Sequence, residues 1–117
     1  MSLSSKKCAP CEGGVPALAK KQVLEHLKEL PGWELSENEK AIFVRYAMKD
    51  FAAAIELIRR IARIAEQEGH HPDIHLTGYR RLQIELSTHS IGNLSKNDFI
   101  LAAKISRLQT KKQHTKE

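Results

Sequence analysis

Three histidines and a glutamate are the residues of this sequence most suited to chemistry. His70 and His71 are adjacent, Pro72 follows them, and Glu66 lies four residues before His70. Side chains four residues apart lie on the same side of a helix, so the Glu66 carboxylate can orient an imidazole. Imidazoles exchange protons near neutral pH, as general acid/base catalysis requires. We interpret the segment as a candidate acid/base site, which His89 joins if the next strands return to the same sheet edge.

Two other interpretations of the histidines stay open. Histidines at the ends of helices and strands are often ordinary polar surface. Alternatively, zinc ligands could come from four of them, namely His70, His71, His75 and His89. Against zinc, adjacent side chains point apart, and Pro72 prevents a regular helix between His71 and His75. We therefore favour a site without a metal.

The hydrophobic pattern predicts three helices and four strands. Apolar residues recur at helical spacing in the helices and alternate with polar residues in the strands. Asp50 and Ser95 are suitable N-caps, and Gly69 with Pro72 ends the second helix. The helices are expected over residues 16–30, 51–68 and 96–108, and the strands over 33–35, 41–48, 74–79 and 81–89.

This order, α-β-β-α-β-β-α, predicts an α+β fold. Strands that follow one another as hairpins form an antiparallel sheet, here four-stranded, and three amphipathic helices would cover one of its faces. A parallel central pair, joined by the helix over 51–68 as a right-handed crossover, is the alternative topology.

The predicted helix over residues 51–68 carries two apolar stripes. One contains Phe51, Ile55, Ile58, Ala62 and Ala65, and the other contains Leu57, Ile61 and Ile64. A helix that is apolar over so much of its circumference must be buried on more than one side. Because the sheet also has one uncovered face, we expect a homo-oligomer, a dimer or a tetramer.

Ser95 and Asp98 have the spacing of a capping box. The carboxylate three residues after the N-cap residue can accept a hydrogen bond from the N-cap backbone. The sequence therefore gives Asp98 a structural role at a helix N-terminus.

The two ends of the chain differ in composition from its centre. We expect a flexible arm over residues 1–15, a domain over 16–108 and a polar tail over 109–117. Cys8 and Cys11 form one C-x-x-C pair, which is half a zinc site. We interpret them as two reduced thiols in the arm, with a weak metal or redox site as the alternative.

Length and charge restrict the classes of function. A chain of 117 residues suffices for one compact domain. The formal net charge is +5, but the lysines are scattered and aromatic residues make up 5%, so direct nucleic-acid binding is not expected. No apolar run approaches the length of about 18 residues that suggests a membrane span, and no secretory signal is evident. These features predict a cytoplasmic protein that does not bind membranes.

The run from Glu66 to Asp98 resembles the signature of the pterin-4a-carbinolamine dehydratase family. After Glu66-x-x-x-His70-His71-Pro72, gaps of six, nine and eight residues lead to Tyr79, His89 and Asp98. Flanking matches include Pro31-Gly32-Trp33 and Ser87-Thr88-His89-Ser90, and the similarity extends over residues 14–108. The family fold is an antiparallel four-stranded sheet with helices on one face, in agreement with the pattern above.

The resemblance implies a reaction and a role for each site residue. The family removes water from 4a-hydroxytetrahydropterin, which gives quinonoid dihydropterin without a cofactor and serves tetrahydrobiopterin recycling. By position, His70 and His89 would be the acid/base pair, His71 would hold the pterin, and Glu66 would orient the histidines. The pocket lining would include Gly69, Ser87, Thr88 and Ser90.

Two alternatives accompany this resemblance. The first alternative is a pterin-binding or dimerisation module, because animal members also dimerise with a homeodomain transcription factor. The loop over residues 73–78 is one residue longer than in those animal members. It resembles a branch associated with other pterins, in molybdenum-cofactor metabolism, which is the second alternative.

Overall fold

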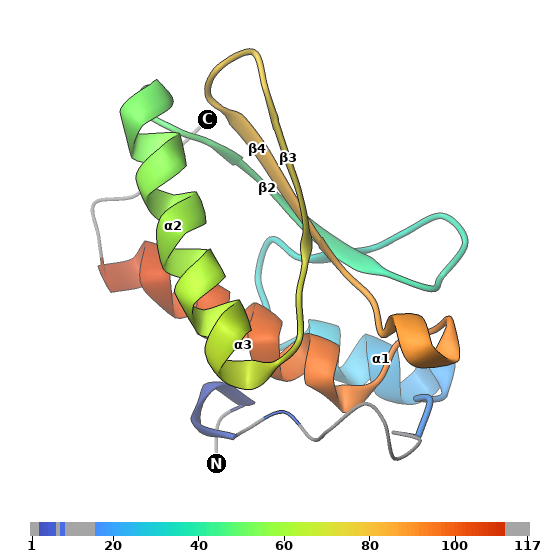
Figure 1. The fold of residues 1–117 in the computed structure, drawn as a ribbon. Helices are drawn as coiled ribbons and strands as arrows, with labels where there is room; N and C mark the ends of the chain where they lie inside the picture. Colours follow the sequence, from blue (N-terminus) through green and yellow to red (C-terminus); the bar gives the residue numbers. More distant parts are fainter. Residues whose placement is uncertain (1–2, 7, 9–15, 112–117) are drawn as a thin grey trace.

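The structure of the protein, a computed structural model, describes residues 3–6, 8 and 16–111. Three α-helices and four strands follow one another in the predicted order, with a short 3₁₀ helix, η1, near the start and another, η2, before α3 (Figure 1). Their bounds are η1 Leu3–Ser5, α1 Lys20–Leu27, β1 Glu34–Leu35, β2 Ile42–Ala47, α2 Phe51–Glu68, β3 Asp73–Thr77, β4 Arg81–Leu86, η2 His89–Ile91 and α3 Lys96–Lys111. The predicted α+β class is confirmed.

Every strand pair in the sheet is antiparallel, and the strand order is β1-β2-β4-β3. The connection from β2 through α2 to β3 passes over β4, which therefore lies between β2 and β3. The alternative with a parallel central pair is wrong, because β2 and β4 run in opposite directions. Figure 1 shows β4 between the other two long strands.

One face of the sheet is apolar and covered by the helices. Ile84 of β4 lies opposite Val44 on one side and Ile74 on the other, so these three side chains share a face. Ile84 is fully buried, and so are Phe99 and Ile105 of α3 in the same core. Each such burial stabilises the fold by about 1.5–3 kcal/mol. The core therefore fixes the sheet against α2 and α3.

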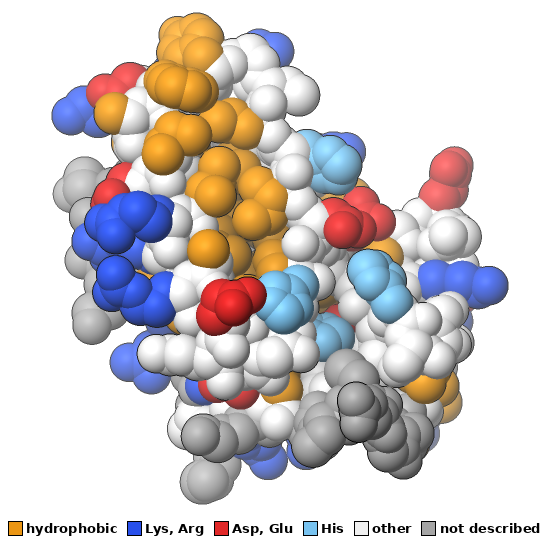
Figure 2. All heavy atoms as spheres, in the orientation of Figure 1, with side chains coloured by type: hydrophobic (Ala, Val, Ile, Leu, Met, Phe, Trp, Pro, Cys, Tyr) orange, Lys and Arg blue, Asp and Glu red, His pale blue; other side chains and the backbone are white. Residues whose placement is uncertain are grey.

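Helix α2 begins and ends at the predicted residues. The Asp50 side chain accepts a hydrogen bond from the Ala53 backbone at 2.8 Å, and Gly69 ends the helix in the left-handed region with φ 68°. Its stripes have different environments: Leu57 belongs to the core, whereas Phe51 is 54% exposed. Figure 2 shows hydrophobic side chains gathered along α2 on the viewed face.

Several element boundaries differ from the predictions, by one to four residues. Helix α1 starts at Lys20 rather than 16, where the Gln22 side chain accepts a hydrogen bond from the Ala19 backbone at 2.9 Å. Strand β4 ends at Leu86, and His89 lies in η2 instead of in the strand. Helix α3 continues to Lys111, so the first residues of the predicted tail are helical. Such boundaries are the least certain part of a pattern-based prediction.

The described part of the predicted N-terminal arm contacts the domain. Leu3 is buried in the core, and the Cys8 backbone N–H donates to Glu68 Oε1 at 2.9 Å. Cys11 and residues 112–117 lie outside the described residues, so the expectations for the C-x-x-C pair and for the end of the tail stay predictions. In the described ranges, no helix has the length and apolarity needed to span a membrane.

Candidate active site

Two segments that are distant in the sequence form a cleft at one end of the sheet. The link between α2 and β3 supplies Gly69, His70, His71 and Pro72, and β3 supplies its first residue, Asp73. The segment after β4 supplies Ser87, His89 and Ser90. The cleft has a volume of about 250 Å³. The structure therefore brings together the three histidines that the sequence singled out.

His70 is the buried member of this group. Gly69 turns the chain as α2 ends, and the backbone N–H groups of Gly69 and His70 both donate to the Ala65 carbonyl, at 2.9 and 3.3 Å. The His70 side chain, 5% exposed, leaves the helix surface and reaches Asp98 on α3, with 2.6 Å between Nε2 and Oδ1. A carboxylate only accepts hydrogen bonds, so Nε2 is the donor in this pair. Asp98 thereby fixes both the orientation and the tautomer of the His70 ring.

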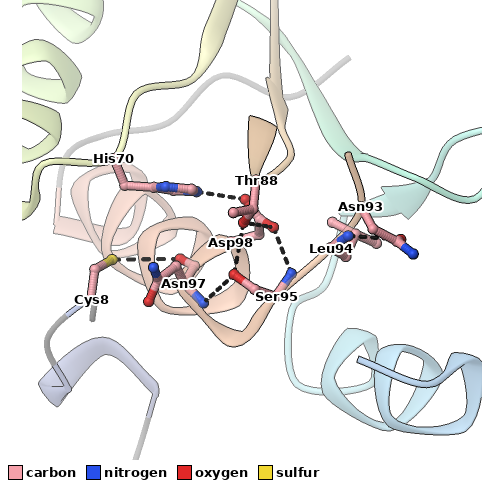
Figure 3. Close-up of polar contacts among 8 residues, drawn as sticks. All are labelled: Cys8, His70, Thr88, Asn93, Leu94, Ser95, Asn97 and Asp98. Carbon is pink, nitrogen blue, oxygen red and sulfur yellow. Dashed lines mark hydrogen bonds and ion pairs between the residues drawn. The ribbon is translucent and has the colours of Figure 1, made fainter. Parts of the chain in front are cut away.

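Asp98 is itself held by a buried hydrogen-bond network (Figure 3). Its Oδ2 accepts from the Ser95 backbone N–H and from the Thr88 hydroxyl, each at 2.9 Å. The Ser95 hydroxyl accepts from the Asn97 backbone N–H at 3.2 Å, one residue earlier than in a standard capping box, so the predicted reciprocal cap is present in a shifted form. Among the described residues, no buried side-chain nitrogen or oxygen lacks a hydrogen-bond partner. The carboxylate therefore caps α3 and positions His70 at once, and the sequence reasoning found only the first role.

His71 and Glu66 form the second histidine–carboxylate pair. His71 Nε2 lies 2.7 Å from Glu66 Oε2, and the two side chains are 60% and 75% exposed. Glu66 thus contacts His71 rather than His70, the histidine at helical spacing from it. The turn at Gly69 explains the difference, because it ends the helix before His70 and directs that side chain inward.

The remaining predicted residues divide into those that line the cleft and one that supports it. His89 opens η2 and is exposed, while Ser87 and Ser90 flank it in the cleft wall. Thr88 does not line the cleft, because its fully buried side chain points to Asp98 and Ser95. Asp73 lines the cleft although no sequence signal indicated it.

His75 is separate from this group. It is exposed on β3 and lies opposite Gln83, on the sheet face away from the helices. Within the described ranges, no three side chains of the His, Cys, Asp and Glu types are grouped so that they could hold a metal ion. The four-histidine zinc arrangement considered from the sequence is therefore not assembled by this fold.

The cleft combines a buried imidazole of fixed tautomer with two further imidazoles and two hydroxyl groups, a set suited to proton transfer. A family model described as pterin 4 alpha carbinolamine dehydratase matches residues 16–108. Fold, cleft and match together define a hydro-lyase, an enzyme that removes water.

Individual relatives agree with this class. The chain is 42% identical to a protein of Arabidopsis thaliana named pterin-4-alpha-carbinolamine dehydratase 2, mitochondrial, over 92% of this chain but only 59% of that protein's length. A protein of Halorhodospira halophila, provisionally given the same dehydratase name, is 41% identical over 92% of this chain and 98% of its own. The chain belongs to the pterin-4a-carbinolamine dehydratase family.

A solved structure supports the fold as well. The crystal structure of a transcriptional coactivator/pterin dehydratase from Brucella melitensis superposes with a TM-score of 0.75 at 29% identity. The match covers 80% of this chain and 98% of the Brucella chain.

Proposed function

We propose that the chain removes water from 4a-hydroxytetrahydropterin to give quinonoid dihydropterin, as a step of tetrahydropterin recycling. The observation that carries the proposal is the cleft in which His70, His71 and His89 meet, with His70 anchored on Asp98. Family membership supplies the class of reaction, and the cleft supplies groups able to perform it.

The reaction needs two proton transfers. An acid must protonate the hydroxyl group that leaves C4a, and a base must take the proton from N5, so that the bound pterin loses one molecule of water. No electrons are exchanged with another molecule, and imidazoles can serve as both acid and base. We assign His70 as one member of the acid/base pair, since the bond from its Nε2 to Asp98 holds the ring in one orientation in the cleft. His89 approaches from the opposite segment of the cleft and is the second member of the pair.

The other cleft residues would bind and orient the pterin ring. His71, whose ring contacts Glu66, would contact the pterin at the exposed side of the cleft. Ser87 and Ser90 offer hydroxyl groups, and Gly69 offers backbone at a position without a side chain. Thr88 would act indirectly, since it bonds Asp98 instead of facing the cleft.

The deciding experiment is an assay of carbinolamine dehydration with purified protein. Replacing His70 or His89 with Ala should lower kcat by about 100-fold or more, the usual scale of acid/base assistance. The double replacement should be worse than either single one, because one imidazole can partly serve both steps. A folded double variant that keeps the parent rate would disprove the proposal, and so would loss of activity on adding a chelator.

Substrate choice has a second candidate. The alternative of other pterins, in molybdenum-cofactor metabolism, rests on the extra residue in the segment over residues 73–78. In the structure this segment is β3 followed by Gly78 rather than a loop, and its first residue, Asp73, lines the cleft. Comparing kcat/KM for carbinolamines with different side chains at C6 separates the two: a preference for the biopterin side chain supports recycling.

The exposed apolar surface of α2 favours an assembled protein. Phe51 and Ile55 are 54% and 43% exposed on one helix, and such patches commonly mark interfaces. We therefore keep the homodimer or homotetramer as the proposed state, with a dimerisation module as the second role.

The name transcriptional coactivator belongs to the Brucella protein and only motivates testing for such a role here. A cytoplasmic location is also proposed, although the Arabidopsis relative is named mitochondrial.

A further inference from the structure

Charged residues on the uncovered face of the sheet are sorted along the strands. Three cross-strand rows of β2, β4 and β3 point away from the helices; in chain order along β2 they are Phe43–Glu85–Asp73, Arg45–Gln83–His75 and Ala47–Arg81–Thr77. The first row is acidic and contains Asp73 of the histidine cleft. The next two rows contain basic side chains and no acidic one. The positive charge is therefore concentrated at the end of the sheet away from the histidine cleft.

The two basic rows enclose a groove of about 470 Å³, larger than the histidine cleft. We call it the basic groove and define it by Arg45, His75, Arg81 and Gln83, all of which line it. The small Ala47 side chain and Thr77 flank Arg81 in its row, which leaves room above the strands. No acidic side chain of the described residues lines the groove.

The donors in the basic groove are partly preorganised. Arg45 Nε donates to Gln83 Oε1 at 2.9 Å, and its guanidinium carbon lies 4.8 Å from the centre of the Phe43 ring. These contacts involve Nε and the flat face of the guanidinium, so they do not use its two terminal nitrogens as donors. They also use the oxygen of the Gln83 amide, so that its NH₂ group is the part left to bind a ligand.

The two arginines of the basic groove are not engaged in ion pairs with the described part of the chain, although the acidic row of Glu85 and Asp73 follows next along the strands. Within the described residues, neither Arg45 nor Arg81 forms an ion pair. On α2, by contrast, Arg59 and Arg60 both pair with Glu56, at 3.0 and 3.2 Å. Unpaired guanidinium groups beside a hollow create a local positive potential that attracts anions. Their planar donor sets match the oxygens of a phosphate group.

We propose that the basic groove binds the phosphate group of a small phosphorylated molecule. Two guanidinium groups, an imidazole, an amide and the Thr77 hydroxyl suit a dianion with several terminal oxygens better than a single carboxylate. The volume accommodates a small organic group attached to that phosphate. The site is distinct from the histidine cleft and does not depend on the dehydratase proposal.

The test is an NMR titration of ¹⁵N-labelled protein with inorganic phosphate and with phenyl phosphate, at constant ionic strength. With either phosphate probe, saturable chemical-shift changes are expected at the backbone amides of residues 45–47, 75–77 and 81–83. A titration with acetate should give only smaller changes at these amides. Arg81→Gln should raise the Kd for phenyl phosphate by at least about tenfold, as loss of a charge-assisted pair implies. Arg45→Lys keeps the positive charge but loses the planar pair of guanidinium donors, so it should also weaken binding.

Arg59→Gln is the matched control, because it removes one positive charge from the paired cluster on α2. It should change the Kd by less than about twofold. Equal effects of Arg59→Gln and Arg81→Gln would overturn the proposal in favour of unspecific attraction. Shifts confined to the histidine cleft would also overturn it. Saturation by a single-stranded oligonucleotide, with no response to either phosphate probe, would replace it with a nucleic-acid site.

Discussion

His70 and Asp98 meet in the interior, with 2.6 Å between Nε2 and Oδ1, although 28 positions separate them in the sequence. The contact joins the turn after α2 to the first turn of α3, and both side chains are almost completely buried. Thr88 and the Ser95 backbone bond the other carboxylate oxygen, so that the carboxylate cannot turn away from the imidazole. The same carboxylate thus links helix capping to the geometry of the proposed catalytic histidine.

Replacing Asp98 should therefore affect both stability and turnover. In Asp98→Asn an NH₂ group replaces one of the two carboxylate oxygens, so that one of the groups now donating to Asp98 loses its acceptor. The free energy of unfolding should fall by about 1–3 kcal/mol. It should also lower kcat at least about tenfold and change the pH–rate profile, because the tautomer of His70 is no longer fixed. Denaturant unfolding and the dehydration assay measure the two effects.

Asp50→Ala is the control for Asp98. This substitution removes the N-cap of α2, where the Asp50 side chain accepts a hydrogen bond from the Ala53 backbone N–H at 2.8 Å. It should lower the free energy of unfolding by about 1 kcal/mol. Turnover should stay at the parent value, since Asp50 is remote from the cleft. If Asp98→Asn behaves like Asp50→Ala, the carboxylate is only a cap.

His71 and Glu66 should influence binding more than chemistry. His71→Ala should raise KM by a larger factor than it lowers kcat, if the ring mainly holds the pterin. Glu66→Gln should change KM by less than about threefold, because the pair is 60% and 75% exposed and such pairs contribute little. Steady-state kinetics on both variants decide this, and a drop in kcat with unchanged KM for His71→Ala would contradict the assignment.

The thiol of Cys8 should react slowly in the folded protein. Burial, followed by the nearby Glu68 carboxylate, raises the pKa of the Cys8 thiol to about 12. Because the thiolate is the reactive form, little of it exists at pH 8. Peptide mapping after iodoacetamide treatment should find Cys8 largely unmodified in native protein and modified in denaturant. Equal labelling under both conditions would place the thiol in a different environment.

Changes on the exposed side of α2 should alter assembly. Light scattering should give the mass of a dimer or tetramer, and Ile55→Lys should shift it toward a smaller species. Leu24→Lys is a suitable control, because Leu24 has a similar exposure, 45% against 43%, but lies on α1. A monomer at high protein concentration would show that α2 does not form an interface.

The elements of the fold could be predicted because their signals are local. The Asp50 cap and the Gly69 turn mark the ends of α2, and the alternation of Leu82, Ile84 and Leu86 marks a half-buried strand. Boundaries such as the end of β4 were less accurate. Thr88 retains a strand-like bridge to Asn93, but its side chain belongs to the buried network and the chain turns into η2.

For the proposed site, the sequence by itself determined which residue types were available and that two histidines follow a helix end. Only the tertiary structure decided that His70 turns inward to Asp98 while His71 stays outside with Glu66. It also decided that Leu57 of α2 faces the core and Phe51 does not. The physical reason is that hydrophobic periodicity specifies faces, whereas partners across the core depend on helix packing and on single backbone turns such as that at Gly69.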